Sequence, residues 1–170
     1  MEKRQKKIKK LAFLGLFAAL AMLLSYVEVL LPPLVSAVPG IKMGLPNVAI
    51  IFVLYRFGGK EAALVSAVRV AMVSILFGNP TTFIYSIAGA ILSISVMIVL
   101  KKLNFLSTVG VSVAGGVFHN AGQILVAMLL LGTAELAYYM IALAVSGTVS
   151  GILIGICGAF LIKKLPMYKI

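Results

Sequence analysis

Hydrophobic positions in this chain form long continuous runs, separated by short polar or Gly- and Pro-containing breaks. Most runs approach the length of about 20 apolar residues that a helix needs to cross a bilayer. Neither strict alternation nor a narrow apolar stripe dominates, so a half-exposed sheet or a soluble helix is disfavoured. The pattern predicts an all-α, polytopic membrane protein with six spans, at about residues 11–31, 44–57, 60–77, 81–100, 108–131 and 135–162.

The second of these segments is too short to cross a bilayer alone. At about 1.5 Å per residue, 44–57 covers roughly 21 Å of a hydrocarbon core about 30 Å thick. The preceding segment, 32–43, holds three prolines and a glycine. Irregular backbone at membrane depth is tolerated only where protein buries it or where it lines a cavity. We therefore expect 32–43 to dip into the bundle as a lid over an outward-facing cavity.

Basic residues mark one side of the membrane. Cytoplasmic ends of spans are rich in Lys and Arg. With a cytoplasmic N-terminus, that side receives Lys3, Arg4, Lys6, Lys7, Lys9, Lys10, Arg56, Lys60, Lys101, Lys102, Lys163, Lys164 and Lys169. The outside receives only Lys42, and Arg69 falls within a span. This split predicts cytoplasmic N- and C-termini, with 1–10 as a basic cytoplasmic segment.

Composition agrees with a protein embedded in lipid. Of the 170 residues, 62% are hydrophobic and only 11% are charged. A soluble domain of this size has too much surface for its volume to hide so many apolar side chains. We expect a single transmembrane domain over 1–170, in the cell membrane and in contact with the bilayer. Topology accounts for the net charge of +11, so nucleic acid is not an expected partner.

Two ionisable residues fall inside predicted spans, where a charge costs about 2.5–3.5 kcal/mol to insert. Arg69 lies roughly 14 Å from the start of its span, and His119 roughly 17 Å from the start of its own. Gln123 follows His119 by one helical turn, and Asn120 is its neighbour. These side chains either contact a ligand or hydrogen-bond to helix carbonyls and amides as structural groups.

No protein carboxylate is expected near Arg69. The chain has no Asp, and its four Glu lie near predicted span ends. An anionic ligand could therefore supply the missing acceptor. The outer half adds the candidate substrate-binding residues Asn47, Asn79 and Tyr85. A single His with no nearby Cys or Asp provides too few ligands for a metal site, so neither a metal nor another cofactor is expected.

Catalytic signatures are missing from the sequence. It has no nucleotide-binding P-loop, so it cannot hydrolyse ATP in that way. Without Asp it forms neither a Ser-His-Asp triad nor the paired-aspartate motif that holds Mg²⁺-diphosphate in prenyl synthases. We expect that the chain is not an enzyme.

Small residues recur at helical spacing in two spans. Gly147, Gly151 and Gly155 lie four residues apart in the last span, as in close helix packing within a membrane. In the first span, Ala12, Gly15 and Ala19 form a stripe near the cytoplasmic end. This second stripe fits either internal packing or docking of a partner helix.

Several segments together carry a family resemblance. They are Pro39–Val48, Leu54–Ala62, Arg69, Leu76–Pro80, Tyr85–Gly89 and Gly110–Gln123. Over nearly the whole chain the pattern resembles the Gx transporter family, often labelled heptaprenyl diphosphate synthase component I. That family is similar to the six-helix substrate-binding S components of energy-coupling factor transporters.

The resemblance implies a high-affinity binding subunit that works with a transmembrane coupling subunit and two cytoplasmic ATPase subunits. It also implies docking through Ala12, Gly15 and Ala19, although the Ala-x-x-x-Ala form common in S components is absent. The first hypothesis is therefore uptake of a small vitamin-like or isoprenoid-related molecule. The alternative is a non-transporting membrane anchor or accessory subunit in prenyl-quinone synthesis or in quinone- or flavin-linked electron transfer.

Overall fold

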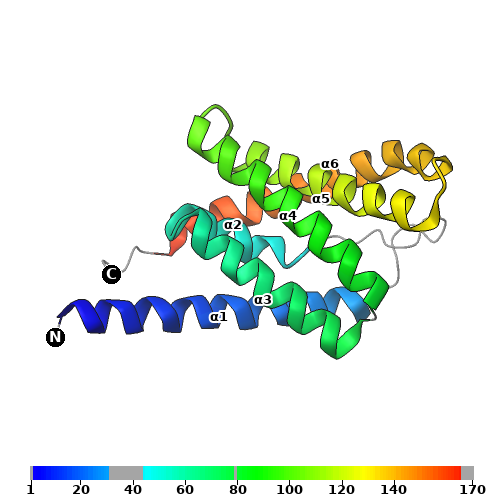
Figure 1. Ribbon diagram of the computed structural model, residues 1–170. Coiled ribbons are helices and arrows are strands. Elements are labelled where there is room, and N and C mark those ends of the chain that lie inside the picture. The colour runs from blue at the N-terminus through cyan, green and yellow to red at the C-terminus, as the bar shows by residue number, and fades with distance from the viewer. Residues whose placement is uncertain (1, 31–43, 79, 166–170) are drawn as a thin grey trace.

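The computed structural model describes residues 2–30, 44–78 and 80–165 (Figure 1). Within them the chain forms six α-helices and a short 3₁₀ helix: α1 (Glu2–Leu30), α2 (Asn47–Arg56), α3 (Gly59–Phe77), α4 (Pro80–Leu103), α5 (Thr108–Leu131), η1 (Glu135–Tyr138) and α6 (Tyr139–Lys164). The all-α prediction with six helices is confirmed. The predicted lid, 32–43, and Asn79 lie outside the described residues.

Four helical segments are long and apolar enough to cross a membrane, so the protein is a multi-pass membrane protein. They correspond to α1, α4, α5 and the continuous stretch of η1 and α6. The other two helices differ for separate reasons. α2 has only 10 residues, while α3 has 19 residues but contains Lys60, Glu61 and Arg69.

Helix boundaries depart from the predicted spans at three places. α1 begins at Glu2, so the basic segment continues the first helix. Lys, Arg, Gln and Glu are good helix formers, and Glu2 pairs with Lys6 one turn later at 3.2 Å. α2 begins only after Pro46, which is its N-cap residue. The last segment opens with η1 before α6 starts at Tyr139.

The helices form two groups with α2 between them (Figure 1). α1 packs on α3, whereas α4, α5 and α6 pack side by side in chain order. α2 contacts α1, α3, α5 and α6. Its apolar side chains Ile51, Val53 and Leu54 are fully buried. A helix that is apolar on all sides needs neighbours all round, which explains why the shortest helix lies at the centre.

α5 and α6 approach closely through glycine. A Cβ atom on Gly116 would lie 2.5 Å from the carbonyl oxygen of Gly147, and one on Gly151 would lie 2.6 Å from the Cα of Val113. Gly155 meets Val109 in the same way, at 2.7 Å. The small-residue stripe of α6 therefore serves internal packing, as small residues commonly do between membrane helices.

We predict that Gly116→Ala destabilises the protein. The new methyl group would meet backbone that cannot move without separating α5 from α6, and overpacking typically costs about 1–3 kcal/mol. Gly15→Ala is the matched control, because no atom lies within 4 Å of the added Cβ. The control should be about 0.5–1 kcal/mol more stable than wild type. Thermal unfolding by circular dichroism suits this test, since the chain has no tryptophan. Equal melting temperatures for the two variants would contradict the packing account.

Basic residues tie several helices together at one end of the bundle. The contacts are Lys10 Nζ to Glu61 Oε1 at 2.5 Å, Arg56 Nη2 to the Leu165 carbonyl at 2.7 Å, and Lys101 Nζ to the Leu54 carbonyl at 2.6 Å. Arg56 also donates to the carbonyl of Ile162. The early part of α1, the start of α3 and the ends of α2, α4 and α6 therefore share this end, which we call the basic end.

Candidate functional site

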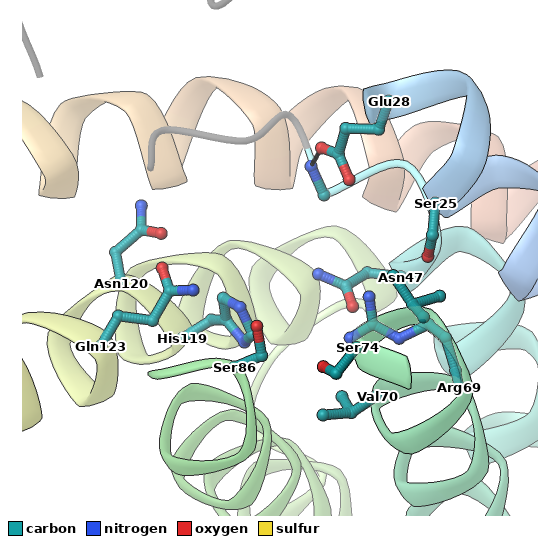
Figure 2. Close-up of a pocket in the computed structure, with 12 residues that line it drawn as sticks. Ser25, Glu28, Asn47, Arg69, Val70, Ser74, Ser86, His119, Asn120 and Gln123 are labelled. Atoms are coloured by element: carbon teal, nitrogen blue, oxygen red, sulfur yellow. Dashed lines mark hydrogen bonds between the residues drawn. The ribbon is translucent and has the colours of Figure 1, made fainter. Parts of the chain in front are cut away.

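Side chains from five helices line a polar hollow of about 50 Å³ in the bundle interior (Figure 2). Its lining residues are Ser25 and Glu28 from α1, Gly44 and Asn47 at the start of α2, Arg69, Val70, Val73 and Ser74 from α3, Ser86 from α4, and His119, Asn120 and Gln123 from α5. Only two of these side chains are hydrocarbon. A membrane protein with a polar interior surface of this kind can hold a polar guest away from lipid.

Five of the predicted substrate-binding residues meet in this hollow: Arg69, His119, Gln123, Asn120 and Asn47. Figure 2 shows Arg69 and His119 on opposite sides, with Asn47 extending between them. Their spacing within each helix explains the convergence. Gln123 follows His119 by four residues, and Val73 follows Arg69 by four, so each pair lies on one face of its helix.

Two other predicted residues are not brought into the hollow by the described structure. Tyr85 is half-buried on α4 but is not among the lining residues, while its neighbour Ser86 is. Successive residues on a helix point about 100° apart, so a shift of one position changes which side chain faces inward. Asn79 lies outside the described residues.

The expectation that no carboxylate lies near Arg69 is wrong. Glu28 lines the same hollow, and its carboxylate interacts electrostatically with the Arg69 guanidinium. Depth estimated by counting residues along each helix axis placed Glu28 near the outer end of its span, well away from the level of Arg69. Long side chains reach along the axis as well as across it, and helical side chains lean toward the N-terminus of their helix. Glu28 therefore reaches a level that its backbone position alone does not suggest.

Gly44 fixes the position of the Glu28 carboxylate. Its backbone N–H donates a hydrogen bond to Glu28 Oε1. The φ angle of Gly44 is +73°, in the left-handed region that glycine adopts without steric cost. A Cβ atom there would also lie 3.0 Å from Asn47 Nδ2. Glycine at this position thus allows the chain to turn into α2 while presenting its amide to the carboxylate.

Arg69 has a buried Nε atom with no hydrogen-bond partner among the described residues. Arg56 shares this feature, so an unpaired Nε alone does not mark a binding site. The surroundings of the two side chains differ. Arg56 donates through Nη2 to carbonyls at the end of α6, whereas Arg69 faces the polar hollow. Arg56 is therefore a structural tie, and Arg69 is the better candidate for a ligand contact.

Asn120 combines a place in the hollow with a structural hydrogen bond. Its Nδ2 atom donates to the Leu143 carbonyl at 2.8 Å and so joins α5 to α6. A smaller hollow of about 20 Å³ adjoins this point and shares Gly44, Asn47, His119 and Asn120 with the first. The polar region thus continues from the α1–α3 side toward α6.

Close helix contact also shapes the wall at His119. A Cβ atom on Gly89 of α4 would lie 2.7 Å from the carbonyl oxygen of His119. On α5, a Cβ atom at Gly122 would lie 2.9 Å from the carbonyl oxygen of Ala88. These two glycines let α4 and α5 meet backbone to backbone beside the hollow, which restricts how far His119 can move.

Four polar lining residues were not among the predicted substrate-binding residues: Ser25, Glu28, Ser74 and Ser86. The spacing of Ser25 and Glu28, three apart on the first apolar helix, was a usable signal because it places both on one face. The position of Ser74 after Arg69 was a weaker signal. Isolated serines are common in membrane helices, where they bond to their own backbone, as Ser25 does to the Ala21 carbonyl at 2.9 Å.

The small-residue stripe of α1 faces outward. Ala12, Gly15 and Ala19 are all exposed, and open space surrounds Gly15. Buried residues of the same helix, including Leu14, Phe17 and Ala21, face the bundle instead. The stripe is therefore available for contact with lipid or with another helix.

The described lining residues offer hydrogen-bond donors, acceptors and one charge of each sign, and this set suits binding of a polar molecule. No group of three or more His, Cys, Asp or Glu that could hold a metal ion occurs within the described ranges.

The sequence model of a family described as heptaprenyl diphosphate synthase component I matches residues 17–161. The match covers most of the chain and confirms the resemblance seen in the sequence. No curated protein and no solved structure matches this chain.

Proposed function

We propose that this chain, which belongs to the heptaprenyl diphosphate synthase component I family, is the substrate-binding membrane subunit of an energy-coupling factor type transporter. Its role would be to capture a small molecule for uptake, as S components do. The observation that carries the proposal is the polar hollow inside an apolar bundle. Placing three half-buried ionisable residues, Arg69, Glu28 and His119, together inside a membrane protein is costly, and such groups usually mark a substrate or ion site.

The proposed topology is a six-span bundle of S-component type in the cell membrane. α2 and α3 would complete the six spans, with α2 shielded from lipid by its four neighbouring helices. The basic end would face the cytoplasm, in keeping with the positive-inside rule. Both termini are then cytoplasmic, and the α5–η1 connection lies outside.

Cysteine labelling tests this orientation. In a Cys157→Ser background, Lys102→Cys should be protected from a membrane-impermeant thiol reagent in intact cells. Ala134→Cys should be labelled, because it lies in the exposed connection before η1. Permeabilised cells provide the control, since both sites should then react. Labelling of Lys102→Cys but not of Ala134→Cys in intact cells would overturn the proposed orientation.

The proposed partners are a transmembrane coupling subunit and two cytoplasmic ATPase subunits. The chain has no nucleotide-binding motif of its own, so energy for uptake would come from these subunits. The exposed stripe of Ala12, Gly15 and Ala19 on α1 is the proposed docking face, because small residues allow close backbone approach between membrane helices. We propose no catalytic role.

The family description favours a second candidate, an accessory or anchor subunit in prenyl-diphosphate or quinone metabolism. Against a direct catalytic part in that chemistry, the chain has no Asp to hold a Mg²⁺-diphosphate. Affinity purification of the tagged chain from its native membrane distinguishes the transporter role from the accessory role. The transporter proposal predicts recovery of a membrane coupling subunit with ATPases. Recovery of a prenyl synthase without ATPases would replace it with the accessory role.

A further inference from the structure

The described lining of the hollow offers little of the surface that an isoprenoid or a large aromatic molecule requires. Val70 and Val73 are the only hydrocarbon side chains among the described lining residues, and this lining includes no Phe, Tyr or Trp. Sites for vitamins and other drug-sized ligands are usually lined mainly by apolar and aromatic side chains. The lining instead favours a hydrophilic occupant.

The charged groups of the described lining are one cation, Arg69, and one anion, Glu28. They interact electrostatically across the hollow. Arg69 and Glu28 are neutral as a pair, so a ligand with a single charge would leave a net charge in a hollow from which it has displaced water, and such a charge is costly. A ligand with both charges can pair with the two groups and keep the hollow neutral.

The geometry also separates the two charges of the guest. α2 begins at Asn47 on the hollow, so the positive end of its helix dipole faces the hollow. Figure 2 shows the Glu28 carboxylate on a different side of the hollow from the Arg69 guanidinium. An ionised carboxylate has about four lone-pair sites, so Glu28 can accept from a ligand as well as from Gly44.

Size limits the guest further. The hollow of about 50 Å³ has room for roughly three to five water molecules, at 10–15 Å³ for each. The adjoining hollow adds about 20 Å³. A phosphate group carries a charge of about −1.5 to −2 at neutral pH, which one arginine does not balance. A carboxylate carries one negative charge and matches the guanidinium in bidentate geometry.

We propose that the hollow binds a small zwitterionic molecule, whose carboxylate pairs with Arg69 and whose protonated amine pairs with Glu28. His119, Asn47 and Gln123 would hydrogen-bond the polar atoms between these two ends. The inference rests on the proposed function, because it names the ligand class of the same site. It disfavours the isoprenoid-related alternative drawn from the sequence, because the described lining offers only two hydrocarbon side chains.

The test uses metabolite fractions as probes, because fractions cover the whole ligand class without a choice of one compound. An extract of the native cells is separated by ion exchange into zwitterions, simple acids, simple amines and a neutral-plus-apolar fraction. Each is added to the purified full-length protein, and the melting temperature is followed by circular dichroism. Only the zwitterion fraction should raise it, by several degrees at saturating ligand. Acetylating the amines or esterifying the carboxylates of that fraction should abolish the increase.

Two variants link the effect to the proposed contacts. Glu28→Gln and Arg69→Met should each lose stabilisation by the zwitterion fraction, while Arg56→Met should retain it. If the neutral-plus-apolar fraction stabilises wild type but not Arg69→Met, the zwitterion proposal is wrong, whereas the proposed binding function still holds. The same conclusion follows if the acetylated zwitterion fraction stabilises wild type as much as the untreated fraction does. Absence of stabilisation by every fraction would overturn both.

Discussion

Replacing Arg69 by methionine is expected to weaken ligand binding by roughly 30- to 5,000-fold while the protein stays folded. Removing one partner of a buried charge pair typically costs about 2–5 kcal/mol of affinity, and about 1.4 kcal/mol corresponds to each factor of ten. The fold should survive because Arg69 contributes to the hollow rather than to the main apolar core around α2. A dilution series of the stabilising metabolite fraction gives the relative affinity.

Arg56 provides a matched control for this prediction. It too has a buried Nε without a partner in the described part of the chain, but its Nη2 atom ties α2 to the end of α6. Arg56→Met should lower the melting temperature and leave the dilution midpoint unchanged. The double variant Arg69→Met/Glu28→Gln removes both charges together, so that the Glu28 charge does not remain in the hollow without the Arg69 charge. A lower melting temperature with normal affinity in Arg69→Met would show that Arg69 is structural.

Bulky substitutions on the outward stripe of α1 should disrupt assembly with the coupling subunit without affecting the fold. In Gly15→Leu and Ala19→Leu, the larger side chain would hold a partner helix away. An overpacked helix contact costs about 1–3 kcal/mol, which weakens association roughly 5- to 150-fold. Both positions are exposed in the isolated subunit, and Gly15 has open space around it. Stability and ligand binding should therefore match wild type.

Ala142→Leu is the matched control for Ala19→Leu. Ala142 is an exposed small residue on α6, in the half of that helix far from the basic end. The same substitution there adds the same apolar surface to a different face. Co-purification of the tagged subunit with its partners measures the outcome. Normal complex yield for Gly15→Leu and Ala19→Leu, or an equal loss for Ala142→Leu, would remove the stripe from the docking model.

Helix number was predictable because each apolar run is long and its ends carry strong breaks. Gly78, for example, is the C-cap residue of α3, and Pro80 is the first residue of α4. The precise start of α2 was harder to predict, since Gly44 and Pro46 fit either a first helical turn or the turn before it. In the structure Gly44 has a φ of +73° and donates to Glu28 of α1, a tertiary contact that the local sequence does not reveal.

Part of the candidate site was also predictable. Arg69 and His119 stood out because ionisable groups are rare within apolar runs, and counting residues from the span starts gave compatible depths. Glu28 was missed because the same counting treats side chains as points on parallel helices. Its relation to Arg69 is a tertiary feature set by the packing of α1 on α3. Tyr85 and Ser86 show the same limit on a finer scale, where one residue of helical rotation decides which side chain lines the hollow.

Native mass spectrometry of the purified wild-type protein tests the central claim most directly. The protein is released from a mild detergent under conditions that preserve bound lipid. Retained lipid is the positive control, because it shows that weakly bound molecules survive the procedure. The account predicts a bound small molecule on wild type and on Arg56→Met, and its loss from Arg69→Met. Wild-type protein that retains lipid but carries no small molecule, or equal occupancy in Arg69→Met, would contradict a substrate-binding role for the hollow.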